Sequence, residues 1–217
     1  MKKVEKIIEQ IITNPEVADD ELLGDRLLQQ FHRGAPLDYL RPLLQSPDER
    51  LASLGAWIAS ELGEKGKPLL GIVGSLLRYP AKQVRFWAID CVLLWAGPSD
   101  GREISQAIRL IDDPEKAVRW KAMDFLFRAS RGQLESALAF MGKEEPVSPN
   151  VLGLRWLLSN AGRDAETVEA ELRSSSTQMR KYAAAAAVRI SKENRHPLLV
   201  AASSDDLDIA NLADRWL

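Results

Sequence analysis

The chain repeats itself with a period close to 34 residues. Val84 and Arg85 recur as Val118 and Arg119, 34 residues later. The repeated segments begin at Ser46, Tyr79, Asp113 and Ser175, and a diverged unit at 148–162 fills the gap before the last of them. A period of this length is typical of repeat proteins, in which one helix pair cannot bury its own apolar face and must stack on the next pair.

Apolar residues follow helical spacing along the chain. Residues 1–13 and 20–31 each place five apolar side chains on one face of a helix. No sustained alternation of apolar and polar residues occurs, so strands are not expected. Asp, Ser and Asn near the turns predict helix N-caps. Small residues at 55, 88, 122 and 183 predict close approach of neighbouring helices.

The repeated units share a polar turn, a Val-Arg step and a small residue four positions after the Val. The residues concerned are Asp113, Pro114, Val118, Arg119, Ala122 and Leu126, with Val84, Arg85 and Ala88 as a second copy. Over residues 36–217 this pattern resembles the HEAT repeat, including its short bacterial variants. The resemblance implies an all-α fold: a right-handed α-solenoid, or superhelix, of stacked antiparallel helix pairs whose second helices line the inner surface. It also implies a pairing of Arg119 with a turn carboxylate, which would be that of Asp113.

We expect a single HEAT-like repeat domain over residues 1–217. Residues 1–35 would form N-terminal capping helices, residues 36–191 the repeats, and residues 192–217 a C-terminal capping helix pair. Gly and Pro stand between the helical segments rather than inside them, which supports this division.

The second helices are predicted to present aromatic residues on the inner surface. If Val118, Ala122 and Phe125 face the core, a step of about 100° per residue turns Trp120 and Asp124 away from it. The predicted partner-binding residues at these and the equivalent or flanking positions are Trp57, Phe86, Trp87, Asp90, Trp120, Lys121, Asp124, Arg155, Trp156, Lys181 and Tyr182. Two interpretations stay open: the rings fill gaps between repeats, or they bind a protein.

Motifs for catalysis, cofactors and metals fail on inspection. The stretch GEKGKP at 63–68 lacks the first glycine and the final Ser or Thr of a phosphate-binding loop. Two histidines and one cysteine occur without metal-ligand spacing, so no cofactor or metal is expected. Cys91 has apolar neighbours and is expected to be buried. The acidic residues Asp205, Asp206 and Asp208 are expected at a helix start, as capping residues.

The charge balance argues against a nucleic-acid partner. The formal net charge is -2, whereas a general DNA-binding protein needs a cationic surface. No apolar run approaches the roughly 18 residues of a membrane span, and the N-terminus lacks the apolar core and cleavage site of a secretory signal. We therefore expect a cytoplasmic protein that has no membrane partner.

These features favour protein binding over enzymatic activity. Short bacterial HEAT-like proteins include adaptors and immunity proteins that neutralise a cognate toxin, and the segment GAWIASELG is similar to such proteins. An inner surface with Asp90 and Asp124 would suit a basic toxin domain. We therefore predict a non-catalytic binding protein that contacts another protein through its concave face, with an immunity protein as the preferred specific form.

The alternative is a DNA glycosylase that acts on alkylated purines. One family of these enzymes is built from HEAT-like repeats and uses tryptophans and an Asp on its concave face, and the spacing of Trp120 and Asp124 is similar. Arg155 is the candidate for the partnering arginine. That family is strongly basic because it contacts the DNA backbone, and this chain is not. A lyase or chaperone for a bilin or another cofactor is a third hypothesis, without a supporting motif.

Overall fold

The computed structural model describes residues 2–159 and 161–217. Over these residues the chain forms fourteen α-helices and five short 3₁₀ helices, and no strand. The all-α prediction is therefore confirmed. The helices gather into two compact units, Met1–Ala96 and Gly97–Leu217, here called unit 1 and unit 2 and described separately. The single domain and the superhelix expected from the sequence stay predictions.

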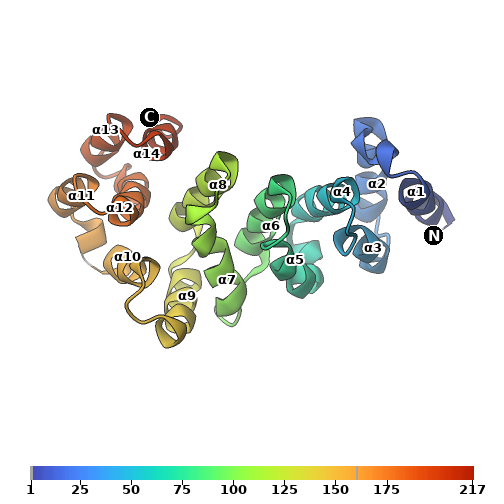
Figure 1. Cartoon of the computed structure of the whole chain (residues 1–217), viewed down its shortest axis with the longest axis horizontal. Helices are drawn as coiled ribbons and strands as arrows, with labels where there is room; N and C mark the ends of the chain where they lie inside the picture. Colours follow the sequence, from blue (N-terminus) through green and yellow to red (C-terminus); the bar gives the residue numbers. More distant parts are fainter. Residues whose placement is uncertain (1, 160) are drawn as a thin grey trace. The chain divides into compact units, whose positions relative to one another are not determined.

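Unit 1 consists of short helices, and several of them pack on the helix that follows in the sequence (Figure 1). Its elements are α1 (Lys2–Thr13), η1 (Pro15–Asp19), α2 (Glu21–His32), η2 (Leu37–Leu40), α3 (Arg41–Leu44), α4 (Glu49–Ser60), η3 (Gly63–Leu69), α5 (Leu70–Leu76) and α6 (Lys82–Trp95). Helix α3 pairs with α4, and α5 pairs with α6. The first helices of these two pairs, α3 and α5, pack on each other, and so do the second helices, α4 and α6. The pair of α3 and α4 therefore packs on the pair of α5 and α6.

Glycines bring the elements of unit 1 into close contact. A Cβ at Gly55 of α4 would lie 3.0 Å from the Leu44 nitrogen of α3, so α4 rests directly on that backbone. Gly63 has a φ of 54°, a conformation that favours glycine, and it ends the turn after α4. Its carbonyl accepts a 2.6 Å hydrogen bond from the indole of Trp95, which is fully buried. That ring ties the end of α6 to the segment that follows α4.

Unit 2 contains four helix pairs. Its elements are α7 (Gly101–Arg109), η4 (Leu110–Asp112), α8 (Lys116–Arg128), α9 (Arg131–Glu144), α10 (Pro149–Leu158), η5 (Ala161–Arg163), α11 (Ala165–Leu172), α12 (Thr177–Ile190), α13 (His196–Ala202) and α14 (Leu207–Asp214). The pairs are α7 with α8, α9 with α10, α11 with α12, and α13 with α14.

Helix α12 is the centre of unit 2. It packs against α8, α10, α11, α13 and α14, and its residues 181–188 are all buried. Five consecutive alanines, 183–187, occupy this stretch. Alanine side chains are small, so helices can approach α12 from several directions at once without leaving voids. The small residue predicted at 183 therefore lies where helices meet closely, as expected.

The inner helices of unit 2 close on one another, which corrects the predicted exposed face. Helix α8 packs on α12 and α14 rather than lining an open surface. Four of the predicted partner-binding side chains are consequently buried: Lys121, Asp124, Lys181 and Tyr182. The prediction that they are exposed to a partner is wrong, because the helical repeat alone does not show which distant helix covers a given face.

Aspartate and serine side chains begin many of the helices, as predicted. The side chains that accept hydrogen bonds from first-turn amides are Asp20, Asp48, Ser130, Ser148, Asp164, Ser176 and Asp206. Asp206 caps α14, and it belongs to the acidic cluster expected at a helix start. Each such cap satisfies an amide that would otherwise lack an acceptor, which contributes about 1 kcal/mol.

No helix in the described part of the chain is long and apolar enough to cross a membrane.

The packing of α10 on α12 depends on Gly153. A Cβ at this position would come within 2.3 Å of the Tyr182 ring, so Gly153→Ala is expected to destabilise the protein by about 1–3 kcal/mol. At Gly142 of α9 an added Cβ meets nothing within 4 Å. Gly142→Ala is the matched control and should be neutral or stabilising by up to about 1 kcal/mol. Urea unfolding followed by circular dichroism measures both variants, and equal effects would contradict this packing.

The thiol of Cys91 in α6 should react only slowly with reagents while unit 1 is folded. The side chain is completely buried, as the sequence predicted, and burial raises the pKa of its thiol well above the ordinary value. We expect a thiol reagent to label the native protein at least about 100-fold more slowly than the protein in guanidinium chloride, as an opening free energy of about 3 kcal/mol implies. Fast stoichiometric labelling without denaturant would contradict the burial.

Candidate functional site

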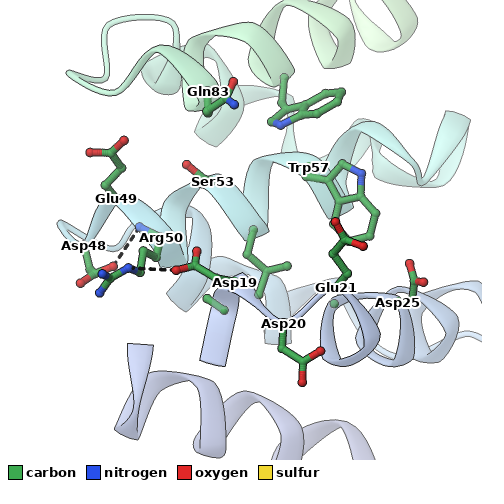
Figure 2. Close-up of a pocket in the computed structure, with 14 residues that line it drawn as sticks. Asp19, Asp20, Glu21, Asp25, Asp48, Glu49, Arg50, Ser53, Trp57 and Gln83 are labelled. Carbon is green, nitrogen blue, oxygen red and sulfur yellow. Dashed lines mark hydrogen bonds and ion pairs between the residues drawn. The ribbon is translucent and has the colours of Figure 1, made fainter. Parts of the chain in front are cut away.

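An open groove of about 920 Å³ crosses α2, α4 and α6 in unit 1 (Figure 2). The lining residues of each helix include a pair one helical turn apart, which therefore shares a helix face. The pairs are Glu21 and Asp25 on α2, Ser53 and Trp57 on α4, and Gln83 and Trp87 on α6. The groove is thus built by side chains of three helices that lie next to one another.

The lining of the groove is strongly acidic. Six carboxylates and one guanidinium border it: Asp19, Asp20, Glu21, Asp25, Asp48, Glu49 and Arg50. The whole chain has a formal net charge of only -2. Negative charge is therefore concentrated at this groove, where the potential of neighbouring carboxylates adds up.

Half of these carboxylates have a structural role. Asp20 accepts hydrogen bonds from the first-turn amides of α2, and Asp48 does the same for α4. Asp19 pairs with Arg50 at 3.2 Å. The other three, Glu21, Asp25 and Glu49, are exposed. These three have no hydrogen bond or ion pair with another side chain in the described part of the chain.

Two half-buried tryptophans give the groove its apolar surface. Trp57 lies against Gly24 of α2, where a Cβ would come 3.1 Å from the ring. Trp87 is held edge-on by Phe86, with ring centroids 5.0 Å apart. Among the described residues neither indole N–H donates a hydrogen bond. Both rings therefore offer a face or a polar edge to a molecule in the groove.

The chemistry of the groove is that of cation recognition. Carboxylates and the faces of indole rings both attract positive charge. Across residues 2–159 and 161–217, no group of three or more His, Cys, Asp and Glu side chains is placed to hold a metal ion. The carboxylates of the groove are spread along it instead of converging on one point (Figure 2).

The predicted site residues of unit 1 fall in or beside the groove. Trp57 and Trp87 line it. Phe86 supports Trp87, and Asp90 lies one turn after Phe86 on α6, half-buried. The helical pattern predicts Trp87 on a flank of the inner surface, whereas in the structure it lines the groove. Their role in binding stays a prediction.

The predicted Trp120 and Asp124 pair of α8 is covered by side chains of unit 2. Asp124 is 4% exposed and accepts a 3.2 Å hydrogen bond from Arg128. Arg215 lies over the half-buried Trp120 ring, 4.7 Å from its centroid. Trp216 packs edge-on against Phe127, in the same helix as Trp120, at 4.6 Å. The turn after α14 therefore covers the face of α8 that the sequence predicted to be open.

The remaining predicted site residues lie elsewhere in unit 2. Arg155 is exposed and Trp156 is half-buried, both on α10. Lys181 is buried, and its ammonium donates to the carbonyl of Ile111 at 2.8 Å and to the carboxylate of Asp112 at 3.0 Å. Buried Tyr182 donates to Asn150 at 2.9 Å. Lys181 and Tyr182 thus connect helices within the unit.

Arg85 and Arg119 each donate hydrogen bonds to backbone carbonyls of the turn that precedes their own helix. Arg119 donates to the carbonyls of Asp113 and Pro114 at 3.0 and 2.9 Å, and Arg85 makes the equivalent bonds one repeat earlier, to the carbonyls of residues 79 and 80. Arg119 also donates to the carboxylate of Asp208 at 2.6 Å, which raises the pKa of the arginine. The resemblance predicts that Arg119 pairs with the carboxylate of Asp113, whereas the structure pairs it with the carboxylate of Asp208 in α14.

Sequence reasoning missed the acidic residues of the groove. Glu21 and Asp25 lie in the segment expected to be a capping region, and carboxylates near helix starts are ordinary N-terminal signals. The available signal was their density, because Asp19, Asp20, Glu21 and Asp25 occur within seven residues. Helical spacing places Glu21 and Asp25 on one face, although it does not show that this face lies beside Trp57.

Comparisons with known proteins support the fold and leave the function open. No protein-family model matches the chain, and no curated protein matches it. Crystal structures of two engineered proteins from the Northeast Structural Genomics Consortium are similar to it, each with a TM-score of 0.55. They are 15% and 16% identical in sequence, and the matches cover 100% of this chain and 96% and 98% of theirs. This likeness concerns the fold alone.

The pair of Arg119 and Asp208 is expected to stabilise unit 2 measurably. Both side chains are largely buried, with 24% and 11% of their surfaces exposed. Asp208→Ala should therefore cost about 1–3 kcal/mol, because it leaves a part-buried guanidinium without its carboxylate. Asp205→Ala is the control: its side chain is 86% exposed and pairs with Arg180, so about 0.5 kcal/mol or less is expected. Thermal unfolding of both variants compares them, and a larger loss in Asp205→Ala would contradict the assignment.

Proposed function

We propose that the protein is a non-catalytic binding protein whose groove in unit 1 takes a basic segment of another protein. The observation that carries this proposal is the lining itself, which combines six carboxylates and one arginine with two tryptophans. Tryptophan is enriched among residues that dominate binding energy at interfaces. Complementary charge adds specificity and faster association with a positively charged partner.

The carboxylates without a partner in the protein support this function more strongly than the carboxylates that cap helices. Asp20 and Asp48 already accept hydrogen bonds from backbone amides, so they contribute mainly to the general field. Glu21, Asp25 and Glu49 are exposed and free to pair with ammonium or guanidinium groups. Glu21 and Asp25 lie near Trp57, which combines charge with apolar contact area that a segment of basic and apolar side chains would use.

The proposed function retains the prediction of a HEAT-like protein-binding module but moves its contact surface. The binding face becomes the groove on α2, α4 and α6, and the covered face of α8 is left out. An immunity protein that neutralises a basic toxin domain is the specific form this function would take. The glycosylase alternative has less support, because Asp124 is buried and paired with Arg128.

A basic peptide is expected to bind the full chain in a salt-dependent manner. The probe is a fluorescein-labelled peptide in which arginines and lysines alternate with serines, and anisotropy measures its affinity. Glu21→Gln with Asp25→Asn should weaken binding about tenfold or more, because two unpartnered charges leave the groove. Added salt should weaken binding further by screening.

The matched control is Glu166→Gln with Glu193→Gln. Both glutamates are exposed in unit 2, and the change in net charge is the same. This variant should bind the peptide as the unchanged protein does. A basic peptide that binds no better than a glutamate peptide of equal length would overturn the proposed function.

A further inference from the structure

The two ends of the groove differ in how their carboxylates are used (Figure 2). At one end Asp48 accepts a hydrogen bond from the Arg50 amide at 2.9 Å, and the Arg50 guanidinium pairs with Asp19. Asp48 and Asp19 therefore already have partners within the protein, and exposed Glu49 at this end lies away from Trp57. At the other end Glu21 and Asp25 of α2 lie near the Trp57 ring. That end combines free carboxylates with an aromatic surface.

Glu21 and Asp25 form a like-charged pair on α2, and only Glu21 lies in the first turn, where the helix dipole favours a carboxylate. They lie four residues apart on α2, where two negative charges repel and weaken the helix. The cap of α2 is Asp20, and Asp25 lies beyond the first turn, where the helix dipole no longer stabilises a carboxylate. In the described part of the chain, no basic side chain pairs with either residue. A cation from another molecule would relieve this repulsion.

Gly24 brings the Trp57 ring next to these carboxylates. A Cβ at Gly24 would lie 3.1 Å from Cζ3 of Trp57, so the ring rests on the turn of α2 between Glu21 and Asp25. Trp87 borders the same groove from α6. A cation that reaches the carboxylates therefore also meets an indole, and the face of an indole attracts cations.

We propose that Trp57, Trp87, Glu21 and Asp25 form a subsite for an arginine side chain of the basic partner segment. This inference rests on the proposed function and adds which cation the groove selects. A guanidinium is planar, so it can stack on an indole face while its N–H groups donate to a carboxylate in a forked arrangement. A lysine ammonium is a compact and strongly hydrated charge that lacks this stacking surface. The subsite therefore prefers arginine.

The test compares three labelled peptides of equal length and charge whose cations are all arginine, all lysine or all trimethyllysine. Anisotropy with the full chain at one ionic strength gives the three affinities. We expect the arginine peptide to bind about tenfold more tightly than the lysine peptide. Trp57→Ala and Trp87→Ala should each reduce this ratio to within about twofold, with circular dichroism confirming that the variants are folded.

A second variant keeps the test decisive if the tryptophan variants do not fold. Glu21→Gln with Asp25→Asn changes two exposed side chains and should also reduce the arginine preference, since the forked hydrogen bonds to the carboxylates weaken. Equal affinity for arginine and lysine peptides would overturn the subsite while leaving the proposed function intact. Tightest binding of the trimethyllysine peptide would overturn the arginine assignment in favour of a methylammonium site. Failure of all three peptides to bind would overturn the proposed function as well.

Discussion

Close contact between helices at glycine and alanine is the constraint on which both units depend. In unit 1, Gly55 lets α4 rest on the backbone of α3. In unit 2, the alanine run 183–187 lets α12 contact five other helices. Short helices have little apolar surface of their own, so their stability comes from this packing rather than from helix propensity. The groove depends on the same kind of contact, because the missing side chain of Gly24 lets the Trp57 ring pack against α2.

The groove derives its charge from the way its helices begin. Helices α2 and α4 both start beside it, and each begins with an aspartate cap followed by a glutamate. Such residues are favourable at helix N-termini because they accept amide hydrogen bonds and oppose the helix dipole. Structural requirements therefore account for much of the negative field. Asp25 is the exception, since neither capping nor the dipole explains it.

Features that depend on local pattern were predictable from the sequence, and features that depend on distant contacts were not. Helical spacing and turn chemistry predicted the all-α fold, the aspartate and serine caps and the burial of Cys91. The exposure of Asp124 and Lys181 was predicted wrongly, because a repeat period describes contacts between neighbouring pairs only. The meeting of α8 with α12 and α14 depends on helices far apart in the chain. Glu21 and Asp25 were missed because their side chains resemble ordinary helix-start signals.

The contact of α8 with α14 sets unit 2 apart from a linear array of repeats. In such an array each pair touches only its neighbours, so a pair can be added or lost while the others persist. Here Arg119 meets Asp208 across 89 residues of sequence, and the two intervening pairs span that distance. Duplication or loss of one helix pair between them would move Arg119 and Asp208 apart. Unit 2 should therefore tolerate substitutions better than the addition or loss of a pair, and its long-range closure should make it fold more slowly than a row of helix pairs.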